Sequence, residues 1–312
     1  MSHPAIEPIS LALHAPDAHA FAARLGASLA RHGFAVVADH GLDQARLDAS
    51  LVDAKAFFAL PEAVKRGYHI VGGAGQRGYT PFRTETAKGG EHADLKEFWH
   101  VGRDLPPGHA FAEILPDNVW PSEIAGFRHS QSWLFAALET LGAVVLSAVA
   151  RYLTLDPALL AQATAQGNSI LRLIHYPPTL GQGGAVRAGA HEDINAITLL
   201  LGAEEAGLEI LDRSGAWLAI NPPPGSAVVN IGDMLARLTN DVLPSTTHRV
   251  VNPAPDRQSV ARYSTPFFLH FRPDYRIETL ASCVTPQRPD RYPDPILAAD
   301  FLAQRLREIK LA

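Results

Sequence analysis

The carboxy-terminal half of the chain is divided into short apolar runs separated by proline and glycine, and this pattern constrains the fold more than any other feature. Each run is long enough for a strand and short for a helix, and several are rich in β-branched or aromatic residues. Regularly spaced strands with turn signals between them favour an antiparallel sandwich or barrel. The runs that predict strands are residues 171–176, 196–201, 207–211, 217–220, 227–231, 248–251 and 264–271.

The first half of the chain has the spacing of helices instead. Asp17 and Asp43 each precede an apolar pattern of helical period, where an aspartate side chain can accept hydrogen bonds from the first turn. Gly33 ends the first of these helices, before a strand-like run at 34–37. A long helix is predicted around 133–149, and its apolar residues on two sides indicate that it is buried. An amphipathic helix is predicted within 293–310.

The composition of the chain excludes several classes of protein function. The 312 residues carry a net charge of −5 with dispersed basic residues, which argues against a nucleic-acid surface and against anionic membranes. The longest apolar stretch, near 141–150, is short for a membrane span. A single cysteine, Cys283, excludes an intramolecular disulfide framework, and the first residues lack a secretory pattern. We therefore expect a soluble cytoplasmic protein without nucleic-acid or membrane partners.

A short metal-binding pattern lies within the predicted strands. His191 and Asp193 are two residues apart, and His248 opens a later run. In an extended backbone, residues i and i+2 point to the same side, so His191 and Asp193 can reach one ion. With His248 they form a set of two imidazoles and one carboxylate. This set leaves several positions open on an octahedral ion, as non-haem Fe(II) oxygen chemistry requires.

The residues alone leave a second interpretation of this pattern open. With 14 histidines and 32 acidic residues, a His-x-Asp triplet is expected somewhere by chance. His191 would then be a hydrogen-bonded surface histidine, and His248 a satisfied core histidine. Two neighbours favour the metal instead: the pair precedes the apolar run 194–201, and His248 begins a β-branched run. Ligands at strand edges would form a rigid site.

Several stretches outside this pattern resemble one known family, the 2-oxoglutarate and Fe(II)-dependent oxygenases of the isopenicillin N synthase-like group. The likeness runs through most of the chain, in the same order as in the family. In the first half it is carried by residues 31–34, 39–41, 57–61, 77–79, 84–86 and 94–97. In the second half it is carried by the His-x-Asp at 191–193, by 230–233, by the distal histidine at 248–250 and by the Arg-x-Ser at 262–264.

The resemblance implies a mainly β fold with flanking helices, namely a double-stranded β-helix (a jelly-roll, cupin-like barrel) braced by α-helices. We expect residues 1–120 to form an amino-terminal helix and strand region packed on the barrel, and 121–165 to form bracing helices. Residues 166–275 are expected to be the catalytic core, and 276–312 a carboxy-terminal segment with a helix. The oligomeric state stays undetermined by the sequence.

The resemblance also implies how 2-oxoglutarate is held. Arg262 and Ser264 match the family's Arg-x-Ser, which binds the distal carboxylate, since a guanidinium pairs with a carboxylate through two N–H groups and the hydroxyl adds another donor. Tyr176 matches a position where plant-like members carry a tyrosine near the cosubstrate. The chain departs from the pattern at Ile174, where those members often have asparagine. From the residues alone, Tyr176 could equally be a packing tyrosine. Arg262 could be a surface residue, but its place before the apolar run 265–270 favours a partly buried, paired arginine.

The implied activity is that of a dioxygenase using Fe(II), 2-oxoglutarate and O2. Oxidative decarboxylation of 2-oxoglutarate to succinate and CO2 would be coupled to hydroxylation, or a related oxidation, of an unidentified small molecule. Two alternatives stay open. An iron oxidase of the isopenicillin N synthase type dispenses with 2-oxoglutarate, and the metal set does not separate the two enzymes. A non-catalytic metal-binding module on a cupin-like scaffold is the other, and Arg262 and Ser264 count against it.

The substrate pocket is the least determined feature. The resemblance places residues 80–100 near the mouth of the active site, so we expect Phe82, Arg83, Phe98 and His100 to contribute to it. For Phe82 and Phe98, the alternative interpretation is simple core packing.

Overall fold

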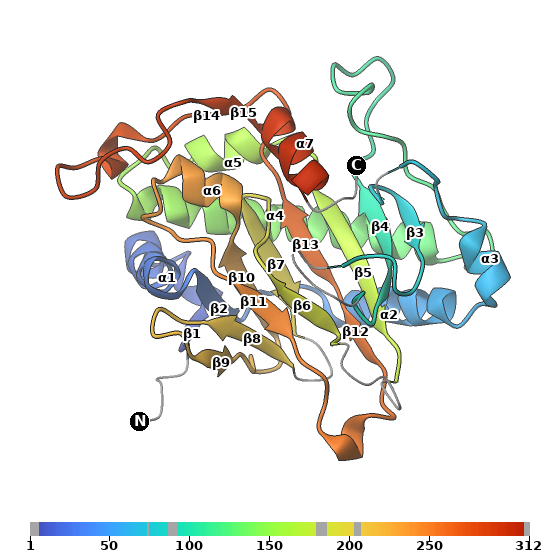
Figure 1. Ribbon diagram of the computed structural model, residues 1–312. Helices are drawn as coiled ribbons and strands as arrows, with labels where there is room; N and C mark the ends of the chain where they lie inside the picture. Colours follow the sequence, from blue (N-terminus) through green and yellow to red (C-terminus); the bar gives the residue numbers. More distant parts are fainter. Residues whose placement is uncertain (1–5, 74, 87–92, 179–185, 203–206, 309–312) are drawn as a thin grey trace.

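Two β-sheets of unequal size form the centre of the molecule, and helices cover the outer side of the larger sheet (Figure 1). The computed structural model describes residues 6–73, 75–86, 93–178, 186–202 and 207–308. In the larger sheet every pairing is antiparallel except that of β1 with β2. This arrangement is the double-stranded β-helix that the sequence predicts.

The strands are grouped by sheet. The large sheet has the spatial order β1 (Pro8–Ser10), β2 (Phe34–Ala38), β10 (Ser226–Ile231), β7 (Ile197–Leu201), β13 (Pro266–Leu269), β5 (Ile170–Tyr176), β4 (Glu97–Gly102) and β3 (Gly78–Thr80), with β12 (Arg262–Ser264) also paired to β5. The small sheet has the order β6 (Ala188–His191), β11 (His248–Val250), β8 (Leu208–Leu211) and β9 (Trp217–Ala219). A separate ribbon is formed by β14 (Arg276–Ile277) and β15 (Ile296–Leu297).

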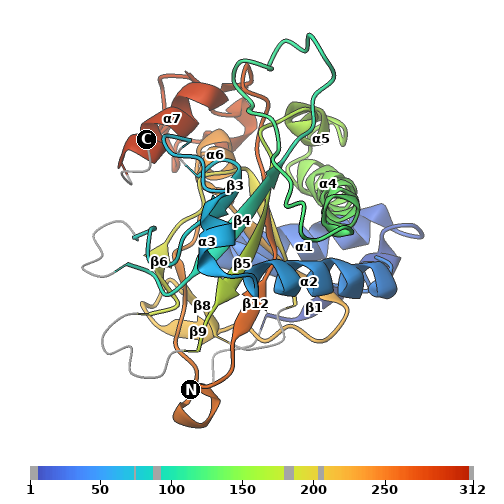
Figure 2. The same cartoon turned by 90° about the vertical axis from the view of Figure 1, so that its right-hand side faces the viewer.

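The longest helix, α4, lies behind the large sheet and contacts β7 and β13 as well as α1, α2 and α5 (Figure 2). It is long and apolar enough to cross a membrane, which differs from the expectation that no segment is long enough. Its apolarity has a structural cause, because two of its sides are buried against the sheet and the other helices. The helices are α1 (Ala18–His32), α2 (Gln44–Phe58), α3 (Glu62–Arg66), α4 (Phe127–Tyr152), α5 (Leu159–Thr164), α6 (Asp233–Leu238) and α7 (Ala298–Glu308).

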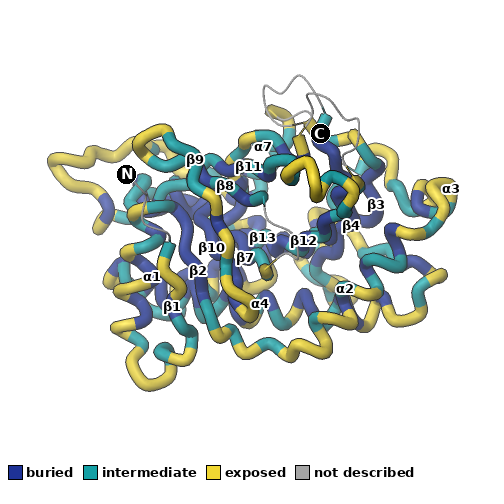
Figure 3. Tube along the Cα trace, turned by 90° about the horizontal axis from the view of Figure 1, so that it is seen from below, coloured by how far each residue is buried: buried dark blue, intermediate teal, exposed yellow. Residues whose placement is uncertain are grey.

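Side chains alternate along each strand between the two faces of the sheet, which separates an outer hydrophobic core from the interior of the barrel. On β5, Leu171 and Leu173 join the main hydrophobic core beneath the helices. Ile174 and Tyr176 belong instead to a smaller cluster that includes Val250 of the opposite sheet. Buried strands therefore occupy the middle of the molecule, with exposed loops and helix faces around them (Figure 3). Side chains on the inner face are the ones available for a site.

Most of the predicted elements are present, and the predicted strands differ little in their bounds. The long helix begins six residues earlier than predicted, and the carboxy-terminal helix begins five residues later. The side chain of Asp17 accepts from Ala20 N at 2.9 Å and that of Asp43 from Arg46 N at 3.2 Å, so both predicted helix caps are confirmed. The predicted strand 264–271 differs, because it is divided between β12 and β13. Pro266 cannot donate a backbone hydrogen bond, and it stands at the first position of β13, where a proline is tolerated.

The amino-terminal region does more than pack on the barrel. Its strand β2 pairs with β10, and its strands β3 and β4 extend the large sheet beyond β5. Residues from the first third of the chain therefore line the same sheet as residues from the last third. Residues 309 and 310, the end of the predicted carboxy-terminal helix, lie outside the described residues, as do 311 and 312.

Gly33 provides a test of how α1 is fitted to the segment before β11. It has a φ of 67°, and a Cβ at this position would lie 2.2 Å from Thr246 Oγ1 and 2.6 Å from the Pro244 carbonyl oxygen. We expect Gly33→Ala to lower the free energy of unfolding by about 2–4 kcal/mol, since the left-handed conformation and the steric overlap both cost free energy. Urea denaturation measures this change.

Gly41→Ala is the matched control, because Gly41 has a φ of 70° but nothing within 4 Å of an added Cβ. It should lower stability by only about 1 kcal/mol. Equal losses in the two variants would show that the contact with residues 244–246 does not limit stability.

Candidate active site

Three potential metal ligands meet at one end of the barrel. His191 ends β6, His248 begins β11, and the two residues are direct partners in the small sheet. Asp193 follows β6 by two residues, and its Oδ1 lies 3.9 Å from His191 Nε2 and 3.8 Å from His248 Nε2. The ligand atoms of all three side chains lie within 4.8 Å of one another.

The two imidazole rings are oriented by backbone carbonyl groups. His191 Nδ1 is 2.8 Å from the Gly189 oxygen, and His248 Nδ1 is 3.1 Å from the Thr246 oxygen. Each Nδ1 therefore carries the proton, and each Nε2 presents its lone pair towards Asp193. Burial and the neighbouring His248 lower the pKa of His191 to about 4. The neutral ring that binds a metal is thus the resting form at pH 7.

The carboxylate of Asp193 is held by the two central strands of the large sheet. Its Oδ2 accepts hydrogen bonds from Thr198 Oγ1 on β7 and from Asn230 Nδ2 on β10, the latter at 2.8 Å. Burial raises the pKa of Asp193, but the two histidines and these hydrogen bonds outweigh it and leave the pKa below its usual value. Oδ1 remains directed at the histidines. The donor set therefore fits a divalent ion that accepts nitrogen and oxygen ligands.

The predicted cosubstrate residues lie together on the inner face of the barrel. Arg262 is the direct partner of Tyr176 across β12 and β5, and Ser264 is the partner of Ile174. Partners in adjacent strands point to the same face, so all four side chains share the interior. The Arg262 guanidinium lies 5.2 Å from the centre of the Tyr176 ring.

These residues are buried deeper than the metal ligands. Arg262 and Tyr176 are each only 2% exposed, so the arginine is not a surface residue. Tyr176 packs in the cluster that contains Val250, two residues beyond His248 on β11. Ile174 packs in the same cluster, so the position where related enzymes often carry asparagine is apolar here.

A cavity of about 700 Å³ opens beside the metal ligands. Phe98 and His100 line it, as expected, because both lie on the inner face of β4 opposite Ile174 and Arg172. Phe82 and Arg83 are not among the described residues that line it. They follow the end of β3, and the Arg83 guanidinium lies 5.5 Å from the centre of the Phe82 ring.

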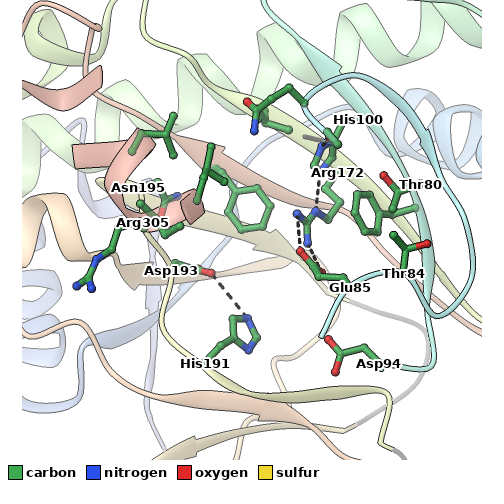
Figure 4. Close-up of a pocket in the computed structure, with 18 of the residues that line it drawn as sticks. Thr80, Thr84, Glu85, Asp94, His100, Arg172, His191, Asp193, Asn195 and Arg305 are labelled. Carbon is green, nitrogen blue, oxygen red and sulfur yellow. Dashed lines mark hydrogen bonds and ion pairs between the residues drawn. The ribbon is translucent and has the colours of Figure 1, made fainter. Parts of the chain in front are cut away.

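The sequence analysis did not single out several residues of this site. Arg172 and the acidic and basic side chains around it face the metal ligands across the cavity (Figure 4). A charged residue in the middle of the apolar run 171–176 was a usable signal, because an unpaired charge is rarely buried. Thr198 gave no comparable signal, since a polar residue in a strand has many ordinary explanations. Asn230 lies in the segment 230–233 that carries the resemblance, but the resemblance gave it no role in holding Asp193.

Two family models cover most of the chain. The model described as "non-haem dioxygenase in morphine synthesis N-terminal" matches residues 6–123, and that of the "2OG-Fe(II) oxygenase superfamily" matches residues 167–271. The chain belongs to the 2-oxoglutarate and Fe(II)-dependent oxygenases. Two curated relatives agree: the 2-oxoglutarate-dependent dioxygenase citB of Monascus ruber is 35% identical, covering 80% of this chain and 78% of its own. The proline hydroxylase buaE of Petromyces alliaceus is 31% identical, covering 92% of each chain.

Solved structures of 2-oxoglutarate oxygenases superimpose on the whole oxygenase. A 2OG-Fe(II) oxygenase family protein from Caulobacter crescentus gives a TM-score of 0.92 at 60% identity, covering 98% of this chain and 100% of that one. A full-length Neurospora crassa protein, in complex with alpha-KG and thymine, gives a TM-score of 0.84 at 26% identity, covering 96% of each chain.

These similarities decide between the activities left open by the sequence. The oxygenase is a non-haem Fe(II) and 2-oxoglutarate-dependent dioxygenase that acts on a small molecule, rather than a cosubstrate-independent oxidase or a non-catalytic module. Bound iron with 2-oxoglutarate supplies the activation of O2, with release of succinate and CO2. The protein holds the metal through three side chains, fixes their orientation through β7, β10 and two carbonyl groups, and provides a cavity for the substrate.

The residues around Asp193 allow a graded test of the metal centre. His191→Ala or Asp193→Ala should abolish Fe(II) binding and 2-oxoglutarate turnover, because each removes a ligand. Asn230→Ala should lower metal affinity by about 10- to 100-fold, the usual effect of removing a residue that orients a ligand. Metal affinity is measured by anaerobic titration.

Asn118→Ala is the control for the loss of a side-chain amide, since Asn118 hydrogen-bonds Gly102 and Asp104 away from the metal ligands. It should leave metal affinity unchanged. Wild-type affinity in Asn230→Ala would mean that Thr198 alone orients the carboxylate.

Arg262 provides a test of the cosubstrate anchor. We expect Arg262→Ala to raise the KM for 2-oxoglutarate by about 30-fold or more, because removing one partner of a buried, charge-assisted pair costs on the order of 2–5 kcal/mol. Arg272→Ala is a matched control, since Arg272 pairs with Asp274 on the surface and its side chain is 41% exposed. Steady-state succinate formation measures both. An unchanged KM in Arg262→Ala would place the anchor elsewhere.

Proposed function

We propose that this oxygenase hydroxylates a small, uncharged molecule with a flat ring, bound in the cavity beside His191 and Asp193. The observation that carries the proposal is the setting of Arg172. Its guanidinium carbon lies 4.2 Å from the centre of the Phe98 ring and 5.2 Å from that of Phe268, and all three residues line the cavity. Aromatic rings and a guanidinium plane together favour flat molecules that stack.

The charges on this wall favour an uncharged substrate. Arg172 and Lys96 are both paired with Glu85, and Lys96 also pairs with Asp94. Burial raises the pKa of Glu85, but Arg172 and Lys96 outweigh it and hold the pKa far below its usual value. Two cations thus meet two carboxylates. A charged substrate would lose its hydration without a spare counter-charge from this group.

The similarity to the thymine-bound Neurospora crassa structure supports the proposal. That protein has been crystallised with thymine, a small uncharged ring with carbonyl groups. Thymine and related bases are therefore suitable first compounds for this oxygenase. The donors on the Arg172 guanidinium suit carbonyl oxygen atoms of such a ring.

We also propose that the enzyme belongs to the isopenicillin N synthase-like group and works in the cytoplasm without nucleic-acid or membrane partners. The motif at 191–193, 248 and 262–264 supports the grouping. The net charge of −5 and the single cysteine support the location. Fractionation of the host cell followed by immunodetection tests the location.

A matched pair of compounds tests the substrate class. With Fe(II), 2-oxoglutarate and O2, thymine should stimulate succinate release more than thymine-1-acetate, which has the same methylated ring and an added charge. Phe268→Leu should raise the KM for the ring substrate by about 3- to 10-fold, since a ring contact contributes about 0.5–1.5 kcal/mol beyond burial. The KM for 2-oxoglutarate should not change. Turnover confined to charged compounds would refute the proposed class.

A further inference from the structure

The strand that carries His191 is weakly held by its own sheet. β6 lies at the edge of the small sheet and pairs only with β11 among the described strands. Its pairing is also irregular: Ala188 faces Val250 and His191 faces His248, so two residues of β6 stand against one of β11. Such a bulge bends an edge strand and redirects its side chains. Contacts other than the β6–β11 backbone hydrogen bonds must therefore fix the position of His191.

A segment from the amino-terminal region lies along this edge. Leu95 N donates to the Val186 oxygen at 3.0 Å. Asp94 Oδ1 accepts from Gly189 N at 2.9 Å, within the bulge. The carbonyl group of that same Gly189 is the one that orients His191 Nδ1. The Asp94 carboxylate therefore holds the peptide group between residues 188 and 189. The next peptide group, between residues 189 and 190, carries the carbonyl oxygen that orients the His191 ring.

Asp94 is itself fixed by buried charges. Its Oδ2 accepts from Lys96 Nζ at 2.9 Å, and Lys96 also contacts Glu85 at 2.5 Å. Glu85 is in turn bound by Arg172 at 3.2 Å. Figure 4 shows Asp94, Glu85 and Arg172 along one side of the cavity, across from Asp193. Both Asp94 and Lys96 are almost completely buried, at 5% and 6% exposure.

Burying these charges has a cost that needs an explanation. A buried ion pair is often no more stabilising than an apolar pair of similar size, because both ions lose their hydration. The pKa of Lys96 is raised, since Glu85 and Asp94 outweigh the effect of burial, so the group stays charged at pH 7. An apolar pair could not provide a rigid hydrogen-bond acceptor for Gly189 N.

We propose that Asp94, held in place by Lys96, is a positioning residue for the iron ligand His191. It acts through Gly189: by accepting from the bulged strand, it fixes the carbonyl group that sets the His191 ring and thus the direction of Nε2. This role does not depend on which substrate the cavity takes. It makes the amino-terminal region part of the metal centre.

Anaerobic titration of the full chain with Co(II), followed by its visible absorption, tests the proposal. Asp94→Ala should lower Co(II) affinity by about 10-fold, the lower end of the range found when a residue hydrogen-bonded to a ligand is removed, because Asp94 acts through Gly189. Asp94→Asn keeps one acceptor oxygen for Gly189 N but loses the acceptor for Lys96 Nζ, so it should lower affinity less than Asp94→Ala does. Loss of affinity in Asp94→Asn equal to that in Asp94→Ala would refute the acceptor role.

Two further variants separate positioning from stability. Asp53→Ala removes a carboxylate that accepts from Ser130 Oγ at 2.6 Å between α2 and α4, and it should lower the Tm without changing Co(II) affinity. Asp94→Glu keeps the charge but displaces the acceptor by one methylene, so it should change the Co(II) absorption even if Asp94→Ala fails to fold. A wild-type spectrum and affinity in folded Asp94→Glu would overturn the proposal.

Discussion

The carboxylate of Asp193 is the constraint on which the rest of the site depends. A buried charge is tolerated only when it is hydrogen-bonded or paired, and Asp193 has both kinds of partner. Thr198 and Asn230 hold one oxygen from directly paired positions on β7 and β10, while the other oxygen faces two histidines from the small sheet. Asp193 therefore connects the two sheets through its polar contacts, and a bound ion would add metal–ligand bonds to this connection.

Paired charges also line the wall of the cavity that faces Asp193. Arg172, Glu85, Lys96 and Asp94 form a connected group that carries no net charge and ends at Gly189, beside the iron ligand. The same group shapes the wall against which the proposed substrate would stack. The two proposals together would link substrate selection and metal geometry through buried ion pairs rather than through a single apolar packing layer.

Much of the fold could be predicted because local signals agreed with the tertiary structure. Aspartate caps and Gly33 defined α1 and α2, and apolar runs ended by proline or glycine gave most strands of the barrel. The residue pattern placed His191, Asp193 and His248 in one metal set, and the resemblance added Arg262 and Ser264. Strands β3, β4 and β6 were missed, since they are short or mixed in polarity and are stabilised by pairing with distant segments.

The sequence by itself determined the metal-ligand set, the caps of α1 and α2 and the family to which the chain belongs, because these depend on residue identity and short spacing. Only the tertiary structure decided which polar residues surround that set. Asn230, Thr198 and Asp94 reach it from three separate parts of the chain, and Phe82 and Arg83 do not line the cavity although they are close in sequence to residues that do. The reason is that strand register and the twist of paired sheets bring distant residues together, and neither can be predicted from the spacing of neighbouring residues.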